Sequence, residues 1–321
     1  MVVGVCSTTA NFQPTTTTNQ LISAAQNTEK QLLRLAAQRQ LYASAKQVFG
    51  WQVIIAGPVA ITGTVFVFLS PEFKVYVASW GLLVALCDLF WLTPWQKSMR
   101  ESAARIQEAF DCDVLELKWN NLKAGKYPDP ELVKAQSTKY EKWSGQMPTL
   151  KDWYSPRVDE LPLYVGRIVC QRTNCWWDST QRRHYAAWLV GIVALVFVVV
   201  CGLALSGGAS LESLLLKGVF PLAPALLIAL RQFTEQREAA DRLDKLKDHC
   251  STIWKEALSG KSKSALTEMS RNIQDEILEN RRRAPPVLDL IFKRLRNDYE
   301  ANMNHAASHY VSEAKLALKI P

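Results

Sequence analysis

Four long apolar stretches constrain this 321-residue chain more than any other feature. They cover residues 50–69, 75–95, 186–206 and 211–230. Each is about 20 residues long, which as a helix spans about 30 Å, the thickness of a bilayer core. We therefore predict four membrane-spanning helices. A buried or re-entrant helix is the alternative for the fourth stretch, because Glu212 and Lys217 near its start shorten its uncharged part.

Basic side chains near the ends of these stretches predict their orientation. The two short turns between paired stretches contribute only Lys74 and Lys217. The opposite side carries many more: Arg39, Lys46, Lys97, Arg100, Arg105, Arg172, Arg182, Arg183, Arg231, Arg237, Arg242 and Lys245. Lys and Arg accumulate on the cytoplasmic side of membrane proteins. We therefore predict a multi-pass protein of the cell inner membrane, with two hairpins and with the N- and C-termini in the cytoplasm.

The remaining residues are predicted to be helical and cytoplasmic. The predicted segments are a disordered N-terminus (1–26), an amphipathic helix leading into the first span (27–49), a first transmembrane hairpin (50–95), a helical loop domain (96–185), a second transmembrane hairpin (186–230) and C-terminal helices (231–321). Strand-like alternation is missing from the sequence. The predicted fold class is therefore all-α: a polytopic membrane protein with four transmembrane helices in two hairpins plus a helical cytoplasmic domain.

Within the loop domain, Asp129-Pro130-Glu131 predicts a helix start, because a capping carboxylate precedes a proline in the first turn. That helix is expected to end near residue 143, and residues 150–159 to be irregular. A further helix is predicted over residues 162–170, with another beginning near Asp178 and leading into the third span. The second span is expected to continue to residue 110, with a kink near Pro94.

The C-terminal helices show a heptad-like apolar seam. Its members recur at spacings of four and three: Ala239, Leu243, Leu246, Cys250, Ile253 and Ala257. This spacing fits a contact between chains, and an ordinary amphipathic helix packed within one chain is the alternative. The run Arg281-Arg282-Arg283 is predicted to be a solvated helix end before Pro285-Pro286.

Catalytic and metal-binding patterns are missing from the sequence. His305 and His309 are four residues apart, but Ala-Ala-Ser between them lacks the glutamate of zinc proteases. The net charge of +8 is divided among the polar segments, without the dense basic run of a nucleic-acid groove. We therefore predict that the protein is not an enzyme, has no metal or cofactor and does not bind DNA or RNA.

Polar and proline residues inside the spans are the candidates for pore lining or gating. Asp88 is the ionisable group farthest inside a span, where a carboxylate must face the bundle, a partner chain or water. Pro58, Pro221 and Pro224 interrupt the helical hydrogen bonding of the first and fourth spans. The alternatives are a structural hydrogen bond for Asp88 and simple kinks for the prolines.

Two motif blocks flank the predicted loop domain. The first is Ile106-Gln107-Glu108-Ala109-Phe110-Asp111-Cys112-Asp113-Val114, followed by Leu117, Trp119, Asn120, Gly125, Pro128 and Glu131. The second follows Trp153-Tyr154 and is Cys170-Gln171-Arg172-Thr173-Asn174-Cys175-Trp176-Trp177-Asp178, with Arg182, Arg183 and Tyr185. With the arrangement of two plus two spans, the chain resembles the SMODS-associated four-transmembrane effector family over about residues 30–310.

The resemblance implies an effector of a bacterial CBASS-like antiviral defence system, encoded beside a cyclic-oligonucleotide synthase. Such an effector is expected to permeabilise the inner membrane and cause growth arrest or cell death. A pore needs several copies of a four-helix bundle, so a homo-oligomer in the lipid bilayer is predicted. A membrane-anchored signalling or scaffold protein, whose cytoplasmic helices bind a partner, is the alternative, and a transporter would need polar groups in several spans.

The resemblance also implies a cyclic oligonucleotide activator, made by an operon-encoded nucleotidyltransferase. The residues next to the membrane are the candidates for sensing it, because arginines and amides suit phosphates and bases while indoles offer stacking faces. The candidate ligand-sensing residues are Gln171, Arg172, Asn174, Asp178, Arg182, Arg183, Trp119 and Trp177. The alternative is that these side chains only anchor the loop domain and bond to one another.

Overall fold

The described part of the chain is helical throughout. The computed structural model describes residues 21–59, 70–144, 147–206, 220–287 and 289–321, together with residues 62, 210 and 212. Every described residue lies in a helix, a turn or an irregular connection, and none of them is in a strand. The helical fold class predicted from the sequence is therefore confirmed for these residues.

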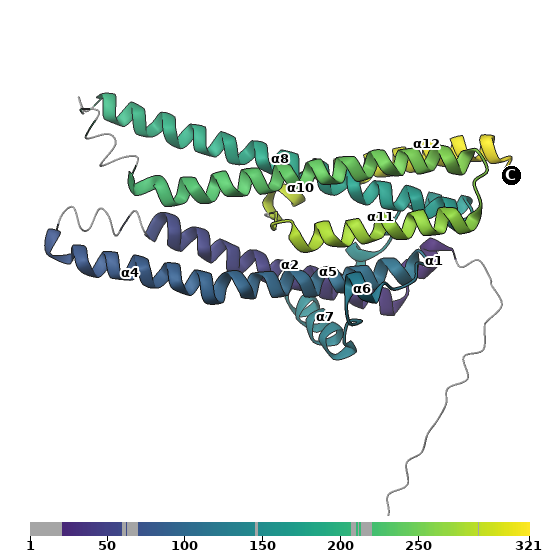
Figure 1. The fold of residues 1–321 in the computed structure, drawn as a ribbon, viewed down its shortest axis with the longest axis horizontal. Coiled ribbons are helices and arrows are strands. Elements are labelled where there is room, and N and C mark those ends of the chain that lie inside the picture. The colour runs from purple at the N-terminus through teal and green to yellow at the C-terminus, as the bar shows by residue number, and fades with distance from the viewer. Residues whose placement is uncertain are drawn as a thin grey trace, which may run out of the picture.

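Two long helical pairs extend toward one end of the molecule, and the shorter helices gather at the other (Figure 1). The elements are α1 (Ile22–Gln26), α2 (Glu29–Ile54), the π-helix η1 (Ile55–Val59), the 3₁₀ helix η2 (Pro71–Phe73), α4 (Lys74–Cys87), the π-helix η3 (Asp88–Leu92), α5 (Thr93–Val114), α6 (Asn121–Ala124), α7 (Pro130–Ser144), the 3₁₀ helices η4 (Met147–Leu150) and η5 (Pro156–Glu160), α8 (Leu163–Ser206), α10 (Phe220–Leu258), α11 (Lys263–Arg283) and α12 (Asp289–Leu318).

The first pair consists of α2 on one side and α4, η3 and α5 on the other. Helix α2 runs without a break from the predicted amphipathic segment into the first apolar stretch. The second apolar stretch continues into α5 through the π-helical turn η3. Pro94 has no N–H to donate to the carbonyl of residue 90. Because that residue lies inside η3, the π-helical turn occurs where the regular backbone hydrogen bonding of the helix is interrupted. The predicted kink near Pro94 matches this turn.

The second pair consists of α8 and α10. Helix α8 is one helix of 44 residues, so the prediction of a separate helix over residues 162–170 is wrong. No proline interrupts residues 163–206, and the helix continues from the helical core into the third apolar stretch. Helix α10 likewise continues for 39 residues from the fourth stretch into the predicted C-terminal domain.

Of the described helices, only α8, over Leu163–Val199, is both long and apolar enough to cross a membrane. The second predicted span is divided between α4, η3 and the start of α5. The first and fourth predicted spans fall partly outside the described residues. Large apolar side chains are nevertheless exposed on both pairs, among them Trp80, Leu83, Leu86 and Phe90 on the first and Trp188, Ile192, Leu195 and Phe197 on the second. Apolar surface of this extent is typical of a membrane or protein interface.

The N-terminal prediction needs a correction. Residues 22–26, expected to be disordered, form α1, in which the side chains of Ile22 and Gln26 are buried. The Gln26 amide donates to the Tyr154 carbonyl at 3.0 Å, and the Tyr154 N–H donates to Gln26 Oε1 at 2.7 Å. These reciprocal bonds connect α1 to a loop that is distant in the sequence. They hold α1 in an ordered helix, which no local sequence pattern reveals. The rest of the predicted disordered segment, residues 1–20, lies outside the described residues.

The helical core joins side chains from most of the described helices. One cluster contains buried residues of α1, α2, α5, α8, α10, α11 and α12. Helix α7 begins at Pro130, as predicted, and packs on α2. Helix α12 packs on α8 and η5. The predicted irregular stretch 150–159 contains part of η5.

The heptad-like seam is buried inside the chain. The following side chains of the seam are buried within one subunit: Ala239, Leu243, Cys250, Ile253 and Ala257. The expectation that this seam joins copies of the chain is therefore wrong, because α8, α11 and α12 already cover α10. The alternative, an amphipathic helix packed within one chain, is the observed one.

Replacing Ile253 by alanine should destabilise the fold by about 2–5 kcal/mol, as expected for a fully buried aliphatic side chain. Thermal and denaturant unfolding of the detergent-solubilised protein, followed by circular dichroism, measures this loss. Lys245→Ala, an exposed position on the same helix, should change the unfolding free energy by less than about 0.5 kcal/mol. An Ile253→Ala protein with unchanged stability but altered subunit number would contradict this assignment.

Candidate functional site

Asp88 lies in a polar cluster where the first helical pair enters its apolar end. The Gln52 amide donates to Asp88 Oδ1 at 2.6 Å, and the Thr93 hydroxyl donates to Asp88 Oδ2 at 3.3 Å. The Gln96 amide donates to Gln52 Oε1 at 3.2 Å. We call Gln52, Asp88, Thr93 and Gln96 the membrane-edge cluster. This cluster links α2 to η3 and α5 by side-chain hydrogen bonds. These bonds fit the structural alternative for Asp88, and the role of Asp88 in gating stays a prediction.

The three span prolines lie at irregular or terminal positions. Pro58 is in η1, and its carbonyl accepts a bond from the Thr62 hydroxyl at 2.8 Å. Pro221 is in the first turn of α10, where a missing N–H is tolerated, and Pro224 follows in the next turn. Their side chains lie outside the described residues. The predicted gating role of the prolines stays a prediction.

A buried charged network lies within the helical core. Asp111 on α5 is fully buried, and Arg281 Nη1 on α11 lies 2.5 Å from its Oδ2. The Tyr154 hydroxyl donates to Asp111 Oδ1 at 2.6 Å, and the Gln274 amide donates to Oδ2 at 2.9 Å. Burial lowers the pKa of Arg281, but the nearby Asp111, Tyr154 and Tyr42 together outweigh it and hold that pKa above its ordinary value. The guanidinium therefore keeps its charge although it is buried.

Glu108 extends this network by one turn of α5. Arg271 Nη2 donates to Glu108 Oε1 at 2.6 Å and to Asp275 Oδ1 at 2.9 Å, while the Gln274 amide donates to Glu108 Oε2 at 2.9 Å. Burial raises the pKa of Glu108 and outweighs the lowering by Arg271. We call Glu108, Asp111, Arg271, Gln274 and Arg281, with Tyr154, the buried charge network.

Two of the predicted ligand-sensing residues, Gln171 and Asn174, form hydrogen bonds to the buried charge network instead of lining an open site. The Gln171 amide donates to the Ser270 carbonyl at 2.8 Å and to Gln274 Oε1 at 3.1 Å. The Asn174 amide donates to the Tyr154 hydroxyl at 2.9 Å. These bonds connect α8 to α11 and to the loop before η5. Both side chains therefore fit the alternative in which the predicted residues bond to one another and to their own chain.

Arg182 takes part in a second arrangement, at the point where the two helical pairs separate. Arg182 Nη1 on α8 donates to Gln236 Oε1 on α10 at 2.7 Å and to the Pro285 carbonyl at 2.9 Å. The Gln236 amide donates to the Pro286 carbonyl at 3.2 Å. Arg100 Nη1 on α5 donates to the Ala284 carbonyl at 3.0 Å.

The segment thus held, residues 284–287, connects α11 to α12 and lies between the two pairs (Figure 1). Its four residues are buried. We call this segment with Arg100, Arg182 and Gln236 the linker clamp. Asp178, also predicted as ligand-sensing, supports it, because its Oδ1 lies 3.0 Å from Arg182 Nε. The clamp connects the first pair to the second beside the predicted membrane boundary.

The other predicted ligand-sensing residues are separate from one another. The Arg172 guanidinium stacks over the Tyr310 ring at 4.7 Å. Arg183 bonds to Asp244 and, at 2.9 Å, to Asp241 Oδ1. The indole of Trp119 donates to the Gly125 carbonyl at 3.0 Å, and the Trp177 ring meets Tyr299 edge-on at 5.4 Å. From Gln171 to Arg183 the helix rises about 18 Å, so these groups do not converge on one ligand.

The sequence prediction for Arg281 is also wrong. Arg281 is buried against Asp111, whereas Arg282 bonds to Glu101 at 2.6 Å and only Arg283 is an exposed helix-end residue. The sequence of α5 contains a signal that its acids are buried. Ala104, Glu108, Asp111 and Leu115 recur at spacings of four, three and four, and all are fully buried. A charge at a core position of an amphipathic helix indicates a buried partner. Among the described residues, no group of three or more His, Cys, Asp or Glu is placed to hold a metal ion.

Comparison with known proteins gives two matches. The model of the SMODS-associating 4TM effector domain matches residues 20–310 of this chain. A protein of Bacillus cereus (strain VD146), named as a probable CBASS effector molecule, is 22% identical over 227 residues, which are 69% of this chain and 75% of the relative. No solved structure matches the chain significantly. The domain match spans the membrane-edge cluster, the buried charge network and the linker clamp.

Replacing Arg281 by methionine should lower the unfolding free energy by about 3–5 kcal/mol, because it leaves the buried carboxylate of Asp111 without its cation. The double variant Asp111→Asn/Arg281→Met should lose less than the sum of the two single variants. Denaturant unfolding of the purified protein measures all three.

Arg283→Met is the matched control, because this arginine is exposed at the same helix end and pairs with Glu279. Its unfolding free energy should change by less than about 1 kcal/mol. If Arg281→Met were as mild as Arg283→Met, the buried charge network would not hold α5 and α11 together.

Proposed function

The chain belongs to the family of SMODS-associating 4TM effectors, and from that premise we propose that it is a membrane effector that oligomerises and permeabilises the inner membrane. It acts in a bacterial anti-phage nucleotide-signalling system, and its action causes growth arrest or death of the infected cell. The name of the Bacillus cereus relative, a probable CBASS effector molecule, supports this setting. In this proposal the protein acts on lipid without catalysing a reaction.

The apolar surface of the two helical pairs is the observation that carries the proposal. Exposed leucine, phenylalanine and tryptophan side chains cover α4 and the distal part of α8, whereas the other end of both pairs is part of a well-buried polar and apolar core. In water this surface would be unstable, and in lipid it is the expected one. We propose that all four apolar stretches cross the membrane as two hairpins, with both termini in the cytoplasm.

Permeation requires more helices than one chain provides. Two hairpins leave no room for a water-filled path, so the open form is proposed to be a homo-oligomer or a rearranged bundle. The membrane-edge cluster supplies polar groups at the entrance, and the turns at Pro58 and at the start of α10 are places where the helices can bend. Asp88 is proposed to attract cations once the hairpins separate.

The signal is proposed to be a cyclic oligonucleotide from an operon-encoded nucleotidyltransferase. Helices α5 and α8 both pass from the buried charge network into the apolar ends. A ligand that shifts the network or the linker clamp therefore changes the angle between the two pairs, because helices transmit displacement as rigid rods. This arrangement supports a switch from a closed to a permeabilising form.

Expression of the wild-type protein together with its activating signal should depolarise the inner membrane and arrest growth, as measured with a voltage-sensitive dye and by colony counts. Asp88→Asn keeps an acceptor for Gln52, and its amide nitrogen can donate to the Thr93 hydroxyl, but it removes the charge, so the protein should still insert. Loss of about 1 kcal/mol of attraction for a cation should lower the cation current about fivefold in lipid bilayers. Asp129→Asn, in an exposed ion pair with Lys126, is the matched control and should conduct like wild type.

The outcomes separate the proposal from the scaffold alternative. Growth arrest with an intact membrane potential would favour a membrane-anchored protein whose cytoplasmic helices bind a partner. Depolarisation with identical currents for Asp88→Asn and wild type would leave the permeabilising function standing and reduce Asp88 to a hydrogen-bond acceptor within the first pair.

A further inference from the structure

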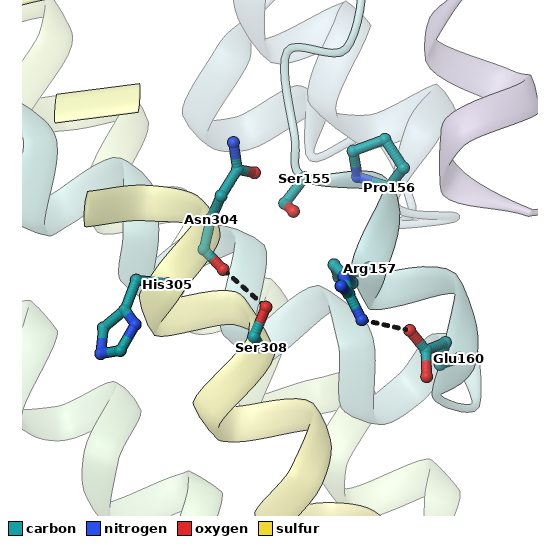
Figure 2. A pocket seen from close by; sticks show the side chains of 7 residues that line it. All are labelled: Ser155, Pro156, Arg157, Glu160, Asn304, His305 and Ser308. Carbon is teal, nitrogen blue, oxygen red and sulfur yellow. Dashed lines mark hydrogen bonds and ion pairs between the residues drawn. The ribbon is translucent and has the colours of Figure 1, made fainter. Parts of the chain in front are cut away.

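A polar cleft of about 530 Å³ lies between η5 and α12, on the cytoplasmic helices and away from the buried charge network itself. Figure 2 shows its two walls, one from each element. The lining residues are Ser155, Pro156, Arg157, Glu160, Asn304, His305 and Ser308. The volume is in the range of small-molecule sites, which is about 300–1,000 Å³.

Ser155 has a polar atom that its own fold leaves without a partner. The residue is 4% exposed, and its buried hydroxyl makes no hydrogen bond with any described residue. A buried hydroxyl without a partner costs about 1–3 kcal/mol, which a ligand can recover by bonding to it. Across the cleft, the Ser308 hydroxyl donates to the Asn304 carbonyl at 2.9 Å, and the Asn304 amide faces the same space (Figure 2).

The charges at the cleft favour an anion. Arg157 Nη1 is 3.6 Å from Glu160 Oε1, and Lys315 Nζ is 2.9 Å from Glu160 Oε2. Lys315 is not a lining residue, but it shares the Glu160 carboxylate with Arg157, so Glu160 keeps a cation when a phosphate binds the Arg157 guanidinium. The side chain of Arg157 is 63% exposed, so its pair with Glu160 is weak and a phosphate can compete for the guanidinium.

Both walls of the cleft connect directly to the arrangements that hold the helices together. Ser155 follows Tyr154, whose hydroxyl bonds to Asp111 in the buried charge network. Asn304 and Ser308 belong to α12, which begins directly after the segment held by the linker clamp. A ligand that bridges η5 and α12 would therefore pull on the network from one side and on the clamp from the other.

We infer that this cleft binds a phosphate-bearing anionic ligand, with its phosphate between Arg157 and the Ser155 hydroxyl and its polar edge at Asn304. The inference rests on the proposed function, under which the ligand is the cyclic oligonucleotide that activates the effector. It assigns sensing to η5 and α12 in place of the residues on α8, whose polar groups already bond within the chain.

The test is calorimetric titration of the full-length protein in nanodiscs with a panel of cyclic dinucleotides and cyclic trinucleotides of adenosine, guanosine and uridine. At least one should bind. Arg157→Ala and Asn304→Ala should each weaken that binding about tenfold, and raising the salt concentration should weaken it further. Glu160→Gln should strengthen it, because the variant removes the acid that competes for Arg157 and Lys315.

The opposite effects of Arg157→Ala and Glu160→Gln exclude a general loss of structure as their cause. Arg237→Ala, an exposed arginine on α10 outside the cleft, is the matched control and should bind like wild type. A panel without a binding member, or a bound member whose affinity is unchanged in Arg157→Ala, overturns the inference.

The two proposals fail separately. A protein that depolarises the membrane when overexpressed but binds no member of the panel retains the proposed function and loses the cleft. A protein that binds through Arg157 and leaves the membrane intact retains the cleft and loses the proposed permeabilisation.

Discussion

The ion pair between Asp111 and Arg281 is the contact on which the arrangement of the core helices depends. Both side chains are buried, and removing two charges from water is unfavourable unless each finds its partner and further donors. Tyr154 and Gln274 supply those donors. An unpaired charge at this depth would be strongly destabilising. Helices α5 and α11 therefore pack in the register that pairs Asp111 with Arg281, and the bond from Tyr154 fixes the loop before η5 to them.

The long helices extend the consequences of that pair to the apolar end of the molecule. Helix α8 is continuous over 44 residues, and α5 joins α4 through a single π-helical turn. In lipid the backbone must stay hydrogen-bonded, so a span responds to a push by tilting or rotating, not by unfolding. The linker clamp lies where the two pairs separate and connects them through Arg100 and Arg182. Under the proposed function, a change in the buried core is therefore converted into a change of angle between the pairs.

Sequence periodicity was sufficient to predict the helices but not the contacts among them. The start of α7 at Pro130 and the irregular turn near Pro94 follow from local chemistry. The core position of Asp111 had a local signal, its spacing from buried apolar neighbours on α5. Its partner Arg281 is 170 residues away, and within Arg281-Arg282-Arg283 no local rule distinguishes the buried arginine from the exposed one.

The contacts of the predicted ligand-sensing residues were unpredictable for the same reason. Arginine and amide side chains in one motif on α8 suggested a ligand, but a helix distributes neighbouring residues over all its faces. Gln171 and Arg182 consequently point to different partners within the chain. The cleft between η5 and α12 unites residues about 150 positions apart, which only the folded chain brings together.

The membrane topology tests the account most directly, because a cytoplasmic core coupled to two membrane hairpins requires every apolar stretch to cross. Full-length proteins carrying a compartment-sensitive reporter would be compared in bacterial cells, with the reporter after Pro321, within α7, after Ser70 or after Ser210. The account predicts cytoplasmic signals for the first two positions and external signals for the last two. A C-terminal reporter found outside the cell membrane, with the α7 reporter inside, would mean that the fourth stretch does not cross and would contradict the account.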